Sequence, residues 1–429
     1  MIRKGRALTA ISAAVISTSL LLTGCGTNAE PEREGTAQDP VTITMSWWGN
    51  DSRAKTTQEV IKKFEEANPD IKVNAEYSEF GAYWDKLATQ VAAGTMPDVI
   101  TMAGSYPGEY ASRGALLDLD QVSGQIDLNQ FDDEILNLGR IEGKQYSITA
   151  GTNSLTMVLD PAVFESAGVP LPDDNTWTWD DYNQIAKELK EKLPSGSFAV
   201  QPFANDVSLV SWARQVGETP FADDGKVSMS RDRIAAWFKE QLDLQKAGAA
   251  PSASQNVENL AATAEQTLLG QGKAAMSITW SNQARSYVGH NLVMAKLPSE
   301  SVKSGNWLRS SMEYTISAKS KYPKAAARLL NFLVNSPEAG KLIKSDRGMP
   351  ASKSVRSEVV DVLNDNQKAE AAYLDRLADM KVTAPKPFPP GTATMTATVQ
   401  RFLSEVLFER KSPEDAAQAF IDEVNSAIR

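Results

Sequence analysis

The chain has 429 residues, 42% of them hydrophobic, with 44 basic and 54 acidic side chains and a formal net charge of −10. This length allows two or three packed domains, and an acidic chain without a basic run beyond its first residues is a poor candidate for binding nucleic acid or an anionic membrane surface. The single histidine, His290, and the single cysteine, Cys25, exclude a Cys/His zinc site, a disulfide framework and any Ser-His-Asp triad without His290, so we expect neither a metal nor a cofactor.

Residues 1–24 have the pattern of an export signal, because the basic stretch MIRKGR precedes an uncharged apolar segment at 7–22. The segment ends in LLTGC, which resembles the bacterial lipoprotein box, and this resemblance implies lipidation of Cys25 by acyl chains such as palmitate. A free cysteine inside an ordinary signal peptide is the alternative. Residues 25–40 are polar and are predicted to form a flexible linker after the lipidated cysteine. We expect a protein anchored on the extracytoplasmic face of the bacterial cell membrane.

Alternating strand and helix patterns follow the linker. Apolar and polar residues alternate over 41–47, as in a strand, and a helical spacing follows until Asn68-Pro69. Alternation returns over 71–77, a second helix over 84–94 ends at a glycine, and a buried strand begins at 99. This order predicts parallel strands joined by right-handed crossovers.

Two later helices have clear start signals. Thr178 is a helix-capping residue with Asp181 three positions on, and Ser412 precedes Pro413 at the next helix. Asp224-Gly225 predicts a turn. Strands and helices alternate almost throughout, which favours two α/β lobes.

Segments along the whole chain together resemble the extracellular solute-binding proteins of bacterial ATP-binding-cassette (ABC) sugar importers, the family that includes maltose-binding protein. They are IKKFEEANPDIKV, WDKLATQVAAGTMPDVI, GALLDLD, GKQYSI, TWTWDDY, GKAAMSITW, YPKAAARLLNFLVNSPEAGKL, RGMPAS and SPEDAAQAF. Leu159-Asp160 departs from a Tyr-Asn pair frequent in the family.

The resemblance implies a type II periplasmic-binding-protein-like α/β fold. In this fold two lobes, each a sheet flanked by helices, are joined by crossing strands at a hinge and enclose an interlobe cleft. The first lobe would comprise 41–152 and 311–352, and the second 153–310 and 353–429.

A sugar offers hydroxyls at its edge and C–H groups on its faces, so its site needs flat apolar rings and polar side chains. Trp47 continues the apolar phase of the first strand and is expected in the core, whereas the adjacent Trp48 is out of phase and is expected in the cleft, near Asn50. The alternative for Trp48 is packing under the following helix.

Further tryptophans are candidates by the resemblance. Trp84 and Trp280 match family cleft positions, and the position of Trp280 holds a stacking tryptophan in relatives. Trp84 could equally be packed on the sheet, and Trp212 and Trp307 are weaker candidates that could be ordinary core. We assign three further tryptophans to packing: Trp177, Trp179 and Trp237.

The polar candidates also follow from the resemblance. Ser105 and Tyr106 follow a strand where the family reads sugar hydroxyls, and Asn153 matches a family position at the first crossover. Ser311 and Arg347 fall in loops that approach the cleft in relatives, although a surface role is equally compatible with each. No basic cluster accompanies these motifs, which argues against a phosphate or carboxylate as the main feature of the solute.

The leading hypothesis is a monomeric receptor, not an enzyme, that captures a carbohydrate, expected to be an oligosaccharide, and delivers it to an ABC permease. One alternative is a secreted carbohydrate-active hydrolase, which requires two carboxylates facing one bond. Another is a receptor for a polyamine, whose site would show several acids among the aromatics. Asp51 and Glu109 are the obvious acids near the motifs.

Overall fold

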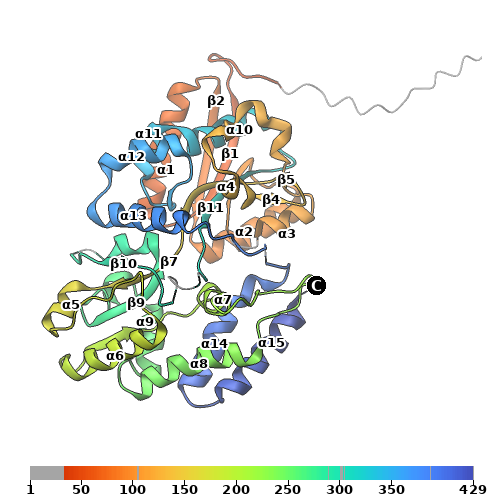
Figure 1. Ribbon diagram of the computed structural model, residues 1–429. Coiled ribbons are helices and arrows are strands. Elements are labelled where there is room, and N and C mark those ends of the chain that lie inside the picture. Colours follow the sequence, from red (N-terminus) through yellow and green to blue (C-terminus); the bar gives the residue numbers. More distant parts are fainter. Residues whose placement is uncertain are drawn as a thin grey trace, which may run out of the picture. The chain divides into compact units, whose positions relative to one another are not determined.

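A computed structural model describes residues 33–103, 106–287, 289–299, 303, 305–386 and 388–428. The expected signal peptide, Cys25 and the candidate residue Ser105 lie outside these residues. The described part contains two larger sheets, each flanked by helices (Figure 1).

The first sheet has six strands in the order β12-β6-β11-β3-β1-β2. Their bounds are Met349–Pro350, Ile148–Asn153, Arg309–Ile316, Val99–Met102, Val41–Trp48 and Ile71–Ser78, respectively. Strand β1 runs parallel to β2 and β3, which confirms the parallel pairing expected from the sequence. Strand β11 is antiparallel to β3 and β6, and β12 is antiparallel to β6.

The two helices between these strands begin and end where local chemistry dictates. Helix α1 (Asp51–Ala67) starts at Asn50, whose side chain accepts a hydrogen bond from the backbone N–H of Arg53 at 3.0 Å, and it stops before Asn68-Pro69. Helix α2 (Phe80–Ala93) ends at Gly94, which has a φ of +70° and closes the last turn with its N–H.

Each face of the first sheet has its own hydrophobic cluster. Trp47, with 1% of its surface exposed, packs with α1, α10 (Pro323–Asn335) and α11 (Pro337–Ile343), which confirms its expected place in the core. Trp48 belongs to the other cluster, with α2 and α3 (Tyr106–Ser112). Neighbouring residues of one strand thus serve opposite faces.

The second sheet has four strands in the order β10-β7-β9-β8, with bounds Val293–Ala295, Leu155–Leu159, Ala274–Trp280 and Phe198–Gln201. One face is covered by six helices: α5 (Pro161–Ser166), α6 (Trp179–Lys192), α7 (Asp206–Arg214), α8 (Arg231–Lys246), α14 (Met395–Leu407) and α15 (Pro413–Ala427). The opposite face packs against α13 (Asp365–Asp379). Helices α8, α14 and α15 contact one another (Figure 1).

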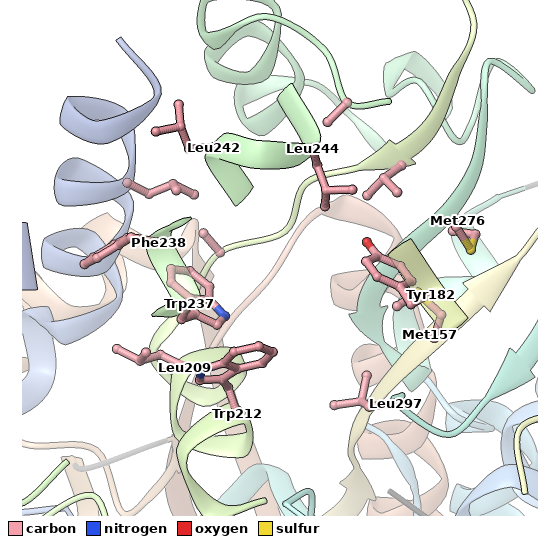
Figure 2. Close-up of a cluster of buried hydrophobic side chains, with 14 of the residues drawn as sticks. Met157, Tyr182, Leu209, Trp212, Trp237, Phe238, Leu242, Leu244, Met276 and Leu297 are labelled. Carbon is pink, nitrogen blue, oxygen red and sulfur yellow. The ribbon is translucent and has the colours of Figure 1, made fainter. Parts of the chain in front are cut away.

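Figure 2 shows part of the larger cluster of the second sheet, in which the strand residues Met157 and Met276 lie beside Tyr182 of α6, and Leu209 and Trp212 of α7 lie beside Trp237 of α8. Trp177 and Trp237 are buried in this cluster and Trp179 packs against it, so the packing roles expected for them are confirmed. The capping box expected from Thr178 and Asp181 is also present, at the start of α6.

The remaining described elements are shorter. They are α4 (Asp133–Asn137), the hairpin of β4 (Arg140–Ile141) and β5 (Lys144–Gln145), α9 (Ala253–Ala261) and α12 (Lys353–Val359). None of the helices in the described ranges combines the length and the hydropathy needed to cross a bilayer.

The chain passes between the two sheets at two adjacent crossings. The first follows β6 and enters β7 at Leu155, and the second leads into β11 at Arg309, which pairs with Asn153. The hydroxyl of Ser154 donates to the carbonyl of Trp307 at 2.7 Å, and the Asn306 amide donates to the carbonyl of Leu155 at 2.5 Å. Hydrogen bonds therefore connect the two crossings to each other.

A third passage follows β12. Helix α12 packs on α11, because Val355 and Val359 lie directly against Gly340, and the chain then reaches α13 on the second sheet. The sequence boundaries at 152/153, 310/311 and 352/353 thus lie near these passages, and the assignment of each residue to a lobe stays a prediction.

Candidate functional site

The carboxyl ends of parallel strands gather side chains at one edge of each sheet. In the first sheet β1 ends at Trp48 and β3 at Met102. In the second, the parallel strands β8 and β9 end at Gln201 and Trp280. Leu155, where the first crossing enters β7, pairs with Trp280, so this edge of the second sheet adjoins the crossings.

Six aromatic rings form what we call the first-lobe aromatic cluster: Trp48, Phe80, Tyr83, Trp84, Tyr106 and Tyr110. The rings of Trp84 and Tyr106 stack with centroids 3.5 Å apart and an interplanar angle of 8°. Trp48 contacts Trp84 with centroids 5.7 Å apart. Three sequence candidates, Trp48, Trp84 and Tyr106, are thus brought together.

Exposure within this cluster is unequal. Trp48 and Trp84 have 9% and 8% of their surface exposed, whereas Phe80 has 51% exposed. The indole of Trp48 is therefore mostly enclosed, as the packing alternative described, although it remains at the strand end. Phe80 was not a sequence candidate, and its place at the start of α2, two positions after the end of β2, is the signal that could have identified it.

The phenols of the cluster are uncharged hydrogen-bonding groups. Burial raises the pKa of Tyr83, whose hydroxyl donates to the carbonyl of Thr101 at 2.8 Å. Burial, followed by the nearby carboxylate of Glu109, also raises the pKa of Tyr106 and Tyr110. These rings can offer hydroxyls without adding charge.

The crossings bring a second group of side chains together. The Asn153 amide is buried and donates to the side-chain carbonyl of Asn282 at 3.2 Å, linking β6 to the segment after β9. Trp280 is half-buried at the end of β9, and the guanidinium carbon of Arg309 lies 5.0 Å from the centroid of its ring. An amide, an indole and a guanidinium thus meet at the edge of the second sheet.

Arg309 was not among the residues predicted from the sequence, because the sequence has no basic cluster near the motifs. The feature that could have identified it is its position as the first residue of β11, directly after the second crossing. Burial lowers the pKa of Arg309, and the negative charges of Asp206 and Glu313 partly oppose this effect. Arg309 is a single cation and not the basic cluster that an anionic solute would require.

Two of the candidate tryptophans contact interior side chains. Trp212 has 8% of its surface exposed and packs near Leu209 and Trp237 in the core of the second sheet (Figure 2). Its ring is covered by the guanidinium of Arg233, 3.9 Å from the centroid. Trp307 has 4% exposed and belongs to the same cluster. Both rings are therefore packed in the core of the second sheet.

The remaining candidates make internal hydrogen bonds. The Ser311 hydroxyl donates to the carbonyl of Gly151 at 3.1 Å and also to that of Arg347. The guanidinium of Arg347 is buried and donates to the hydroxyls of Tyr314 and Thr57. Asn50 caps α1. The Ser311 hydroxyl, the Asn50 side-chain oxygen and the two terminal nitrogens of Arg347 therefore make hydrogen bonds within the chain, whereas Nε of Arg347 is buried without a partner among the described residues.

The described residues contain no group of three or more His, Cys, Asp or Glu side chains placed to hold a metal ion. His290, the only imidazole, lies between the Asp160 carboxylate at 2.9 Å and the carbonyl of Gly270 at 3.1 Å. Asp160 in turn caps α5. This arrangement ties the segment before β10 to the start of α5 and to Gly270.

Comparison with known proteins gives consistent results. The family model of the bacterial extracellular solute-binding proteins matches residues 49–340, more than half of the chain. The diacetylchitobiose binding protein of Streptomyces coelicolor is 24% identical over 424 residues, covering 95% of both chains.

Solved structures share the fold. A periplasmic solute binding protein from Pectobacterium atrosepticum matches with a TM-score of 0.81 and 23% identity, over 91% of this chain and 100% of that one. A periplasmic oligogalacturonide binding protein from Yersinia enterocolitica, in complex with saturated digalacturonic acid, matches with a TM-score of 0.77 and 22% identity, over 90% and 100%. The expected two-lobed α/β fold is confirmed, and the protein belongs to the family of bacterial extracellular solute-binding proteins.

Proposed function

We propose that this protein is the membrane-tethered binding component of an ABC importer, which captures a carbohydrate, expected to be an oligosaccharide, in a cleft between its lobes and delivers it to the permease. The observation that carries the proposal is the gathering of aromatic rings and polar side chains at the strand ends of both sheets. Indole and phenol rings match the C–H faces of sugars, while amides and charged groups match their hydroxyls.

The relatives support this solute class. The Streptomyces coelicolor relative is named for a chitin disaccharide and the Yersinia enterocolitica structure holds a galacturonide. Contacts to both lobes would stabilise a closed form, because a ligand shifts a conformational equilibrium only through its differential affinity. Trp280, Asn153, Trp48, Trp84, Tyr106 and Ser105 are the residues that we propose for contact with the sugar.

The acids considered for a polyamine site have other partners. The carboxylate of Asp51 accepts a hydrogen bond from the hydroxyl of Tyr77 at 2.8 Å, and Glu109 pairs with Arg113 one turn further along. Glu109 is therefore an ion-paired carboxylate, and Asp51 is bound by Tyr77, which lies outside the first-lobe aromatic cluster. Both observations favour the carbohydrate over a polyamine.

Membrane tethering is the second part of the proposal. We place the lipid on Cys25, because LLTGC ends the apolar segment at residues 7–22 and Cys25 is the only thiol of the chain. A cysteine that carries two acyl chains anchors stably, whereas one chain gives marginal binding.

The test is a thermal-shift screen of the purified protein against N,N′-diacetylchitobiose, lactose, galactobiose, maltotriose and digalacturonate, followed by calorimetry. A sugar at one hundred times its Kd adds about 2.7 kcal/mol to the free energy of unfolding. Trp280→Ala should weaken binding of a stabilising sugar by about 1–3 kcal/mol, because the ring contact is lost.

Trp179→Ala is the matched control, since Trp179 is half-buried in the same lobe but packs on Trp212 with centroids 5.0 Å apart. It should lower thermal stability and leave the Kd unchanged. Stabilisation by none of the sugars would contradict the proposed solute class, and an unaltered Kd in Trp280→Ala would contradict the proposed site. Chromatography of the sugar after incubation would reveal turnover if the protein were a hydrolase.

A further inference from the structure

The segment between β11 and α10 carries an exposed group of cations. Residues 314–337 contain no acidic side chain, and the three lysines among them are all exposed: Lys319, Lys321 and Lys324. We call these three side chains the lysine patch. Lys319 and Lys321 form no ion pair with any carboxylate in the described ranges. The patch is a local exception to the net charge of −10, from which weak attraction to an anionic membrane was expected.

Strand pairing and hydrogen bonds place the lysine patch at the end of the first sheet where the parallel strands begin. Strand β11 is antiparallel to β3 and ends at Ile316, which pairs with Val99, the first residue of β3. Asp98, directly before β3, accepts a hydrogen bond from the Ser317 N–H at 2.9 Å through its carbonyl and one from the Ser320 hydroxyl at 2.6 Å through its carboxylate. The segment that carries the patch is therefore attached to the amino end of β3.

The segment that leads into β1 contacts the same end of the sheet. Gly35 lies so close to the turn before β2 that an added Cβ would be 2.2 Å from the Asp70 carbonyl oxygen. The Asp70 carboxylate accepts a hydrogen bond from the Arg328 guanidinium at 2.6 Å. Arg328 follows Lys324 by four positions on α10, so the two side chains lie on one face of this helix. The last part of the expected linker is thus in contact with the domain, about one helical turn from the lysine patch.

Chain length limits how far this end of the sheet can lie from the proposed anchor. Gly35 is ten positions after Cys25, and an extended chain spans at most about 3.5 Å per residue, so the two residues are at most about 35 Å apart. Strand β1 has eight residues, which corresponds to about 26 Å, and Trp48 lies at its other end. The chain therefore joins the anchor to the end of the sheet opposite the proposed solute contacts.

We propose that the lysine patch lies against the anionic lipid headgroups of the bilayer that anchors the protein, so that the opposite end of the first sheet faces away from the membrane. This inference rests on the anchoring proposed above and adds an orientation to it. Lysines near an anionic surface are attracted to it within a Debye length, about 10 Å in 0.1 M salt. A tether alone keeps the protein close to the bilayer without selecting a face, whereas the patch selects one.

The experiment measures energy transfer from a dye on the lipidated protein to an acceptor lipid in phosphatidylcholine vesicles with or without phosphatidylglycerol. Cys25 is the only natural thiol and would be blocked by its lipid, so an introduced cysteine is labelled alone. The dye is attached either at Ala318→Cys, beside the patch, or at Gln184→Cys, an exposed position of α6. Phosphatidylglycerol should increase transfer from position 318 and not from position 184. This increase should disappear in 1 M salt, where the Debye length is about 3 Å.

Replacing the whole lysine patch (Lys319→Gln, Lys321→Gln and Lys324→Gln) should abolish the effect of phosphatidylglycerol. The matched control removes the same charge from three exposed lysines of α6 and should keep the effect: Lys187→Gln, Lys190→Gln and Lys192→Gln. Thermal unfolding and sugar affinity should be unchanged in both variants.

Lipidated wild type with equal transfer in both kinds of vesicle, or a patch variant that keeps the increase, would overturn the orientation and leave the anchoring intact. Mass spectrometry that finds no acyl chain on Cys25 would overturn both.

Discussion

Trp47 and Trp48 show how one residue step decides the role of a side chain. Trp47 belongs to the cluster formed with α1, and the exposed Tyr77 of β2 stacks on it with centroids 5.9 Å apart and an interplanar angle of 19°. Trp48, on the opposite face, contacts Tyr83 with centroids 5.5 Å apart. The strand alternation predicted this division, but it could not predict how much of Trp48 its neighbours would enclose.

Glu313 gives a residue-scale prediction about pH. It lies in β11 with 4% of its surface exposed, and the Ser147 hydroxyl donates to its carboxyl at 2.9 Å. Burial raises its pKa from 4.5 to about 7. Between these values the folded protein holds a proton that the unfolded chain has released, so this group's contribution to stability is complete below the lower value and is lost as the pH rises through about 7.

Glu313→Gln should remove this dependence, because the amide stays neutral and keeps an oxygen for Ser147. Urea unfolding at pH 5 and pH 8 should show a loss of up to roughly 3 kcal/mol in wild type and a smaller loss in the variant. Glu338→Gln is the control, since this glutamate of α11 is exposed and pairs with Lys63 at 3.3 Å. If the free energy of unfolding changes equally between pH 5 and pH 8 in wild type and in Glu313→Gln, the Glu313 carboxyl does not titrate in this range.

At the scale of single elements, the features predicted from the sequence depend on neighbours in the chain. The capping boxes and helix stops involve residues three or four positions apart, and the parallel strands follow from alternation and order. The hydrogen bonds of Arg347 join residues 33 and 290 positions away, to Tyr314 and Thr57. No local pattern reveals such contacts, which is why Arg347 was placed near the solute by resemblance while its side chain is buried in the first lobe.

The site shows the same division. The positions of Trp48 and Trp280 at strand ends follow from their own strands, and both were predicted. The contact of Arg309 with Trp280 joins the start of β11 in the first sheet to the end of β9 in the second, so a sequence pattern gives only the position of Arg309 after a crossing. Burial of Trp212 depends on the packing of α7 against α8, which the sequence of α7 alone does not define.

Gly151 gives an element-scale prediction. It lies in β6 so close to the loop before β12 that an added Cβ would be 2.5 Å from the Arg347 carbonyl oxygen and 2.6 Å from that of Gly348. Gly151→Ala should therefore lower the free energy of unfolding by about 1–3 kcal/mol, because backbone must shift. Thermal and urea unfolding measure this change.

Gly81→Ala is a suitable control, because a Cβ at this position of α2 would have no heavy atom within 4 Å. Alanine favours a helix over glycine by up to about 1 kcal/mol, so this variant should be as stable as wild type or more stable. If Gly151→Ala and wild type have the same free energy of unfolding, β6 and the loop before β12 can move apart without destabilising the fold.

At the scale of the whole molecule, the proposed anchor gives the next prediction. Cys25→Ala should abolish incorporation of labelled palmitate and move the protein from the membrane fraction to the soluble fraction, because each buried methylene of an acyl chain contributes about 0.8 kcal/mol. Sugar affinity should be unchanged, since the proposed sugar contacts lie in the two lobes. Retention of Cys25→Ala in the membrane fraction would contradict anchoring through this residue.

The paired crossings between the sheets have a consequence for assembly. Proteins that form swapped dimers exchange one element through a single hinge loop that opens. Here the passages at Ser154 and at Asn306 are joined by hydrogen bonds to Trp307 and Leu155, and a third passage leads from β12 to α13. Exchange of a lobe between two copies would require all three connections to extend together, so this topology opposes lobe swapping between copies.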